Sequence, residues 1–270
     1  MEMLESTGRS IPSRRSKGHG RAVVLVHGNS ASSRTWQSLF DGPFGTRYRC
    51  LAPDLPGHGK AEPSARQHDY SVPGLAAAVA GFVRAEELRD VVLVGWSLGG
   101  HAVLEAAPML HDVAAGYVVF RAPPVRDGSS FVEAHLPDSP IDIGFRKTIT
   151  LEEAHTFAAG FLAPDSATPV EPLVRDILAT DPAFRSGIAR SIAEGRFADE
   201  VSLVEHLDRP LAVMHGDGEQ FVNRAYLEAL TIPTLWRGAV QVVPDAGHAI
   251  HLERPGVFAD LLDAFVRGLS

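Results

Sequence analysis

A serine stands between two glycines in the stretch Gly95-Trp96-Ser97-Leu98-Gly99. It follows an apolar run and precedes a stretch with a helical pattern. Glycines on both sides allow a tight strand-to-helix turn, because they carry no side chain that would clash there. Such a turn lifts the serine hydroxyl above the sheet and directs the first amides of the helix toward the same place. Ser97 is therefore predicted to be a nucleophile.

A serine hydroxyl is a weak nucleophile at neutral pH, so it needs a base, and the base needs an acid to orient it. His248 lies just after the last expected strand and is the predicted base. The turn at residues 216–222 offers two carboxylates, Asp217 and Glu219. Glu219 is favoured as the acid, because Asp217 directly follows a strand glycine and is better placed to bind turn amides. Asp217 remains the alternative, and Asp245 is expected to shape the turn before His248.

The loop His27-Gly28-Asn29-Ser30 follows the first long apolar run. The backbone N–H groups of Asn29 and Leu98 are predicted to form an oxyanion hole for the reacting carbonyl. The side-chain amide of Asn29 could also bind a substrate oxygen. Four other histidines are expected to be structural: His27, His58, His101 and His251.

Six short apolar runs are predicted strands: residues 21–27, 48–52, 89–95, 116–120, 210–215 and 238–243. Continuous apolar runs, as opposed to alternating ones, indicate that both faces of the sheet are covered, as in a parallel sheet with flanking helices. Helices are predicted at residues 73–87, at 98 to about 107, where Pro108 should end the helix, and at 255–269. The N-terminal residues 6–17 fit either an edge hairpin that turns near Gly8 or a loose tail.

Residues 123–206 contain no strand-like run, but several helix signals. Thr150-Leu151-Glu152-Glu153 fits a capping box at a helix start. The sequence therefore predicts a core of residues 1–122 and 207–270 and a helical cap of residues 123–206. Trp96 is expected either to pack against this cap or to form a wall of the substrate pocket. Phe157 is a further predicted substrate-binding residue, and Phe161 and Phe184 are alternatives for the same wall.

The chain has 270 residues, of which 45% are hydrophobic and 21% charged, with a formal net charge of −8. An acidic chain is unsuited to nucleic acid or an anionic membrane, which call for clustered Lys and Arg. No apolar run approaches the roughly 20 residues that span a bilayer. A small molecule is therefore the expected partner, of a monomer or a homodimer.

Cys50 is the only cysteine, so the sequence allows no intramolecular disulfide and no cysteine-ligated metal. The first twenty residues have no apolar stretch that could serve as the core of a signal peptide. A cytoplasmic location is therefore expected. The dense histidine and aspartate run of metallo-lactonases and the HExxH motif are both absent, so no metal or other cofactor is expected.

Four motifs together resemble the α/β-hydrolase family over essentially the whole chain. They are Val-His-Gly-Asn-Ser at 26–30, Ala-Pro-Asp-Leu-Pro-Gly-His-Gly-Lys at 52–60, Gly-Trp-Ser-Leu-Gly-Gly-His at 95–101 and Ala-Gly-His at 246–248. With a glutamate as the acid, and with Ala122-Pro123-Pro124-Val125 entering the cap, the set is similar to the metal-independent N-acyl homoserine lactonases of that fold. The resemblance implies a mostly parallel sheet with flanking helices and a helical cap inserted after the sixth strand.

The same resemblance implies a serine hydrolase that opens a small ester or lactone through an acyl-enzyme. Ser97 would attack the lactone carbonyl, and His248 would protonate the ring oxygen. Quorum quenching would be the role of such a lactonase. A general small-molecule carboxylesterase is the nearest alternative, and a ligand-sensing receptor on a hydrolase scaffold is another. Haloalkane dehalogenases and epoxide hydrolases of this fold use an aspartate nucleophile, which Ser97 disfavours.

Overall fold

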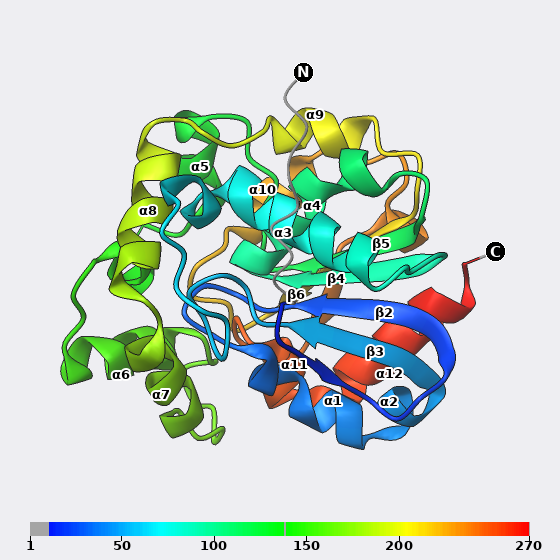
Figure 1. The fold of residues 1–270 in the computed structure, drawn as a ribbon, viewed down its shortest axis with the longest axis horizontal. Helices are drawn as coiled ribbons and strands as arrows, with labels where there is room; N and C mark the ends of the chain where they lie inside the picture. The colour runs from blue at the N-terminus through cyan, green and yellow to red at the C-terminus, as the bar shows by residue number, and fades with distance from the viewer. Residues whose placement is uncertain (1–10, 138, 270) are drawn as a thin grey trace.

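A seven-stranded sheet forms the centre of the protein in a computed structural model that describes residues 11–137 and 139–269 (Figure 1). The spatial order of the strands is β1-β3-β2-β4-β5-β6-β7, with β1 antiparallel to β3 and every other pair parallel. The strands are β1 Ser13–Arg15, β2 Gly20–Val26, β3 Tyr48–Pro53, β4 Val91–Trp96, β5 Ala114–Phe120, β6 Leu211–Gly216 and β7 Gln241–Val243.

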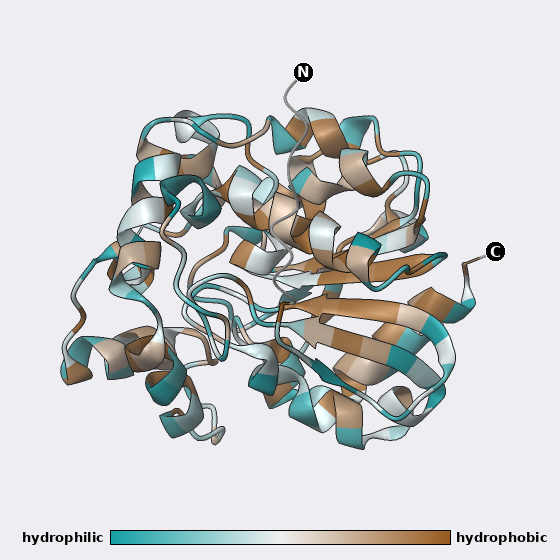
Figure 2. Cartoon of the chain, in the orientation of Figure 1, coloured by the Kyte–Doolittle hydropathy of each residue, from teal (hydrophilic) through white to brown (hydrophobic). Residues whose placement is uncertain are grey.

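All six predicted strands are present, with ends shifted by a few residues. Val23 to Val26 of β2 and Val91 to Val94 of β4 have no exposed surface. Figure 2 shows the corresponding parts of the sheet in the hydrophobic colour. Their burial on both faces explains why these strands are continuously apolar.

Helices cover both faces of the sheet: α3 and α4 lie on one side, and α1 and α12 on the other (Figure 1). The helices outside the segment between β5 and β6 are α1 Gln37–Asp41, α2 Pro43–Arg47, α3 Val72–Ala85, α4 Leu98–Leu110, α10 Arg224–Ala229, α11 Ile250–Glu253 and α12 Pro255–Arg267. Within the described residues, 3₁₀ turns occur at Ser33–Trp36, Gln67–Tyr70, Pro140–Phe145 and Trp236–Gly238. None of the helices in the described part of the chain is long and apolar enough to cross a membrane.

The prediction that Pro108 ends its helix was wrong, because α4 continues through Pro108 to Leu110. Proline has no backbone N–H to donate to the carbonyl four residues before it in the helix, and its ring crowds the preceding turn. The buried residues Ala106, Ala107 and Leu110 surround it in sequence. Packing of α4 against the sheet and α3 therefore outweighs the local preference.

Five helices lie between β5 and β6: α5 Gly128–Ala134, α6 Leu151–Gly160, α7 Glu171–Ala179, α8 Pro182–Ala193 and α9 Glu200–Glu205. Within the described residues they follow the fifth strand, not the sixth, because only one strand, Ser13–Arg15, precedes β2. That strand pairs with β3, and Gly8 lies outside the described residues. The capping box at Thr150 is confirmed, since Thr150 Oγ1 accepts from the Glu153 N–H at 3.1 Å and the Glu153 carboxylate accepts from the Thr150 N–H at 2.8 Å.

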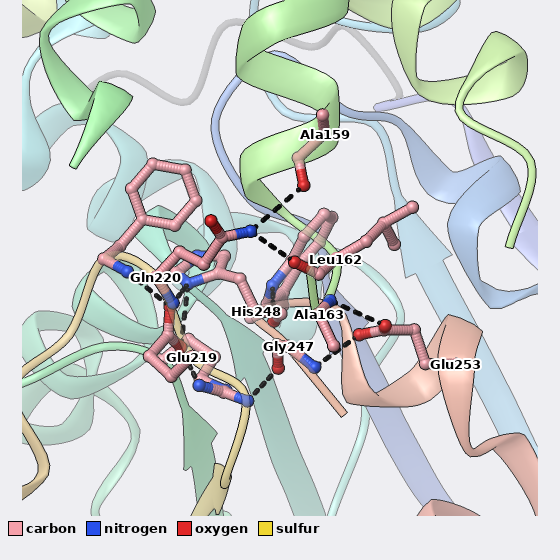
Figure 3. Close-up of polar contacts among 11 residues, drawn as sticks. Ala159, Leu162, Ala163, Glu219, Gln220, Gly247, His248 and Glu253 are labelled. Carbon is pink, nitrogen blue, oxygen red and sulfur yellow. Dashed lines mark hydrogen bonds and ion pairs between the residues drawn. The ribbon is translucent and has the colours of Figure 1, made fainter. Parts of the chain in front are cut away.

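The end of α6 is fastened to the loop that carries His248 (Figure 3). The Glu253 carboxylate accepts hydrogen bonds from the Ala163 N–H at 2.8 Å and the Gly247 N–H at 2.6 Å. The Ala249 N–H donates to the Phe161 carbonyl at 2.7 Å. The α6 end and the His248 loop therefore form one hydrogen-bonded unit.

Replacing Gly247 by alanine is expected to destabilise this unit. A Cβ atom at Gly247 would lie 2.2 Å from the backbone carbon of Leu162 and 2.3 Å from the backbone nitrogen of Ala163. One of the two segments must therefore move, and such overpacking lowers the free energy of unfolding by about 1–3 kcal/mol. Gly256→Ala in α12 is the control, because a Cβ there meets nothing within 4 Å. Urea unfolding that gives equal stabilities for the two variants would contradict the expectation.

Candidate active site

Ser97 occupies the turn between β4 and α4, with φ 53° and ψ −125°. A residue other than glycine held at such a positive φ costs about 1–3 kcal/mol, and functional sites are where such strain is retained. The turn needs Gly99, since a Cβ there would lie 2.4 Å from the His27 carbonyl oxygen. The hydroxyl therefore stands at the N-terminus of α4, as the sequence motif predicts.

His248 meets the Glu219 carboxylate, the acid that the sequence favoured over Asp217. The distance from His248 Nδ1 is 3.0 Å to Glu219 Oε1 and 3.2 Å to Oε2. The Glu219 carboxylate also accepts from the backbone N–H groups of Gln220 at 2.9 Å and Phe221 at 2.7 Å. Among the hydrogen bonds of the described residues, none joins Asp217 to His248, and the Asp217 N–H donates to the Val243 carbonyl. Nδ1 of His248 is thus engaged as a donor, which leaves Nε2 as the site that can accept a proton.

Arg121 is a residue of this site that sequence reasoning missed. It follows β5 directly, has φ 61° and is 2% exposed. Its guanidinium pairs with the Glu219 carboxylate and donates to the Gly247 carbonyl. Burial, and after it the charge of Arg121, hold the pKa of His248 well below its usual value of 6.5. The signal in the sequence was an arginine placed directly after a buried apolar strand.

The loop after β2 lies directly against the Ser97 turn. A Cβ atom at Gly28 would lie 3.1 Å from Ser97 Cβ, so the next residue, Asn29, is beside the serine. Leu98 is the first residue of α4, and its N–H therefore has no acceptor within the helix. The side-chain amide of Asn29 donates to the Gly144 carbonyl at 2.9 Å and accepts from Ser30 Oγ. One N–H of that amide therefore links the loop to the inserted segment, and the role of Asn29 in substrate binding stays a prediction.

Two of the histidines expected to be structural hold the neighbouring loops. The Leu55 N–H donates to His27 Nε2 at 3.0 Å, and the Ser30 N–H donates to His58 Nε2 at 3.2 Å. His251 makes a hydrogen bond with the Thr35 hydroxyl and packs against the Trp36 ring. Asp245 pairs with Arg254 in the turn before His248.

Ser97, His248 and Asn29 line one cavity between the core and the cap. Its apolar wall includes Phe157, as predicted, and Phe161. The remaining apolar lining residues are Val72, Leu98, Val125, Phe131, Ile141, Phe145, Ile192, Phe197 and Phe221. The cavity is therefore suited to an apolar chain that extends from a group held at Ser97.

Two of the aromatic candidates lie elsewhere. Trp96 packs against the Phe161 ring, with the ring centroids 5.4 Å apart, and its indole N–H donates to the His248 carbonyl at 2.9 Å. Phe184 packs against His58 and Tyr70. Neither residue is part of the cavity wall. Trp96 therefore takes the first of its two expected roles, packing under the cap, and it also holds the His248 loop.

The arrangement can support nucleophilic chemistry. A hydroxyl at a helix N-terminus, an imidazole oriented by a buried carboxylate and adjacent amides are the parts that acyl transfer requires. Across residues 11–137 and 139–269, no group of three or more His, Cys, Asp or Glu side chains is placed to hold a metal ion.

Comparison with known proteins agrees with the fold. The chain is 27% identical over 260 residues to a non-heme haloperoxidase of Rhodococcus erythropolis, covering 91% of this chain and 92% of that protein. Among solved structures, the N-acyl homoserine lactonase AidH with bound N-hexanoyl homoserine lactone superposes with a TM-score of 0.89 at 26% identity, covering 94% of this chain and 93% of the other. The esterase RhEst1 of Rhodococcus sp. ECU1013 gives a TM-score of 0.79 at 23% identity, with coverages of 96% and 94%.

The two solved structures therefore share the overall fold of this chain. Residues 23–261, nearly the whole length of the chain, match the sequence profile of the alpha/beta hydrolase family. The chain therefore belongs to the alpha/beta hydrolase family.

Proposed function

We propose that the protein hydrolyses a small ester or lactone through an acyl-enzyme on Ser97. The observation that carries this proposal is the buried Glu219–His248 pair, which faces the same cavity as the Ser97 turn. Ser97 Oγ attacks the carbonyl carbon while its proton passes to His248 Nε2. The Asn29 and Leu98 amides stabilise the resulting oxyanion. The C–O bond then breaks as His248 returns the proton to the leaving oxygen, and water releases the acid by the same steps.

N-acyl homoserine lactones are the substrates that we propose, with quorum quenching as the role. Support comes from the superposition on the lactonase AidH, which is higher in TM-score and in identity than that on the esterase RhEst1. The cavity beside Ser97 also suits an acyl chain, because aromatic and aliphatic side chains line most of it. General carboxylesterase activity is the second candidate, favoured by the esterase relative.

The two candidates are separated by comparing kcat/KM for N-hexanoyl homoserine lactone and p-nitrophenyl butyrate. Lactone opening releases a proton, so a pH-stat records it, and the ester is followed by its coloured product. A lactonase should show the higher kcat/KM for the lactone. Hydrolysis of the aryl ester alone would refute the lactonase proposal and leave the esterase one.

The pH profile tests the proposed role of His248. The imidazole acts as a base only when it is neutral, and its lowered pKa keeps it neutral below pH 6.5. We therefore expect kcat/KM to stay level from neutral pH down through 6.5 and to fall only at lower pH. Arg121→Met should move this fall to higher pH, because the variant removes a positive charge that lowers the pKa of His248. Glu253 raises the pKa of His248 and is unchanged in this variant.

Arg267→Met is the matched control, since Arg267 pairs with Asp263 on the exposed side of α12. Its pH profile should match that of the wild type. An acid limb in the wild type centred at or above 6.5, or one that Arg121→Met leaves in place, would contradict the proposed electrostatics.

A further inference from the structure

Besides the candidate active-site residues already described, three polar side chains line the cavity: His101, His135 and Glu200. His101 follows Ser97 by four residues on α4, which is about one helical turn, or roughly 5.4 Å along the axis. His101 and Ser97 therefore line the same cavity from successive turns of one element.

Glu200 holds the His101 ring in place. His101 Nδ1 lies 2.9 Å from Glu200 Oε1 and 2.8 Å from Oε2. The same carboxylate accepts from the Val125 N–H at 3.1 Å, and the Glu200 side chain is 1% exposed. His101 keeps 15% of its side chain accessible, and its Nε2 forms no hydrogen bond within the described residues.

The charge environment makes His101 Nε2 a donor. Burial lowers the pKa of the imidazole, but the neighbouring Glu200 carboxylate and, to a smaller degree, Glu105 raise it, and the pKa lies above its usual 6.5. Glu105 itself has a pKa raised by burial to about 7. Because the positive ring is already paired with Glu200, it suits a neutral acceptor better than a second anion.

His135 offers the opposite function. Its Nδ1 donates to the Phe131 carbonyl at 2.7 Å, so Nε2 carries the lone pair. Burial, with a smaller contribution from the charges of His101 and His248, lowers the pKa of His135 to about 4, although the bond to the Phe131 carbonyl raises it. The ring is therefore neutral near pH 7. It lies close enough to His101 and His248 for their charges to affect its pKa.

We propose that His101 and His135 form a subsite that binds a secondary amide in the acyl part of the substrate. The amide carbonyl accepts from His101 Nε2–H, and the amide N–H donates to His135 Nε2. This inference rests on the proposed hydrolase function, and Glu200 is a positioning residue in it. A substrate amide gives the Nε2 atoms of both histidines a hydrogen-bond partner, which offsets the free-energy cost of burying them. An alkyl chain leaves both nitrogens without a partner.

Two esters of equal length test the subsite without requiring a lactone. Methyl N-butanoylglycinate carries a secondary amide, and methyl heptanoate has two methylene groups in its place. The readout is the ratio of kcat/KM for the amide ester to that for the alkyl ester, recorded by pH-stat. Comparing this ratio between proteins cancels the intrinsic reactivity of the two esters and any loss of active protein.

His101→Leu is expected to lower the ratio by about 10- to 100-fold, the loss of one hydrogen bond to a charged group. His135→Phe should lower it by about 2- to 10-fold, because its bond is between neutral groups. His155→Leu is the matched control, the same chemical change at an exposed position on α6 outside the cavity wall, and it should leave the ratio as it is in the wild type.

Glu200→Gln provides a second, isosteric variant with a readout of its own. In the wild type, the ratio should fall as the pH rises through the raised pKa of His101 and its ring loses the donated proton. In Glu200→Gln the pKa of His101 is lower, so the same fall should occur at lower pH. Glu105 and His135 also face His101 and are unchanged in this variant.

Each result bears on a separate claim. An unchanged ratio in His101→Leu, or an unchanged pH midpoint in Glu200→Gln, overturns the subsite while the proposed hydrolase stands. Hydrolysis of both esters by Ser97→Ala at the wild-type rate overturns the proposed function, and the subsite with it. A lowered ratio in both histidine variants together with the lowered midpoint supports the subsite.

Discussion

Replacing Ser97 by alanine is expected to lower kcat for the best ester or lactone by about 10⁴-fold or more, the loss seen when the nucleophile of such a site is removed. The reason is that no covalent acyl-enzyme can form, so water must attack the substrate directly. The amides of Asn29 and Leu98 remain, and they account for the residual rate above that in water. Single-turnover and steady-state rates measured on the same preparation check the prediction.

Ser186→Ala is a suitable control for Ser97→Ala. Ser186 lies on α8, where its hydroxyl bonds only to backbone carbonyls of the preceding turn. This variant should keep the wild-type kcat. Circular dichroism should give the same spectrum for both variants, because alanine can replace Ser97 without adding volume. A Ser97→Ala protein that retains more than about a hundredth of the wild-type rate would place the nucleophile elsewhere.

Glu219→Gln is expected to lower kcat by about 10³- to 10⁴-fold. The amide is close in shape to the carboxylate, but it carries no charge to stabilise the imidazolium of His248 and can present an N–H where Nδ1 needs an acceptor. Asp217→Asn is the matched control, with the same chemical change two residues away, and should alter kcat little. A far larger loss in Asp217→Asn than in Glu219→Gln would reverse the assignment of the acid.

The loss of the Glu219 charge also leaves Arg121 buried without its partner, which costs stability on the order of 3–5 kcal/mol. The double variant Glu219→Gln, Arg121→Met removes the unpaired charge and should regain much of that stability. It should not regain activity, because His248 still lacks its carboxylate. Recovery of the wild-type kcat in the double variant would show that the single change acted only through folding.

The strands of the core could be predicted because a strand buried on both faces is a continuous run of apolar residues. Residues 22–26 of β2 and all of β4 are buried, so every side chain in them is apolar and the run can be recognised without knowledge of its partner strands. The turn at Ser97 could be predicted because the glycines on both sides of the serine permit it, and that is a property of five consecutive residues. The end of α4 could not, because the packing that carries the helix past Pro108 comes from other elements.

The role of Arg121 could not be predicted, because it depends on contacts between distant segments. Arg121 and Glu219 are about a hundred residues apart in the sequence and meet only after the sheet has formed. The Asn29 side chain is a second case, since its partner Gly144 lies in the inserted segment. His101 is a third case, because its hydrogen-bond partner Glu200 lies on α9, about a hundred residues further along the chain.

The preference for Glu219 over Asp217 rested on a local argument. The structure places the Glu219 carboxylate beside His248, and its role as the catalytic acid stays a prediction. Asp217 directly follows the last residue of β6, and its backbone N–H is bonded to β7. Two residues further on, the chain has left the sheet and Glu219 can turn its carboxylate to His248 while accepting from its own turn amides. The position of each residue relative to the end of β6 therefore indicated which carboxylate could reach His248.

Covalent labelling with a fluorophosphonate tests the central claim most directly. The probe reacts with a serine only where a base activates it and nearby donors stabilise the charged adduct, so it reports on the assembled site rather than on Ser97 alone. Mass spectrometry of the digested protein should find one adduct, on Ser97, and Ser97→Ala should not be labelled. An unlabelled native protein, or an adduct on another residue, would contradict the account.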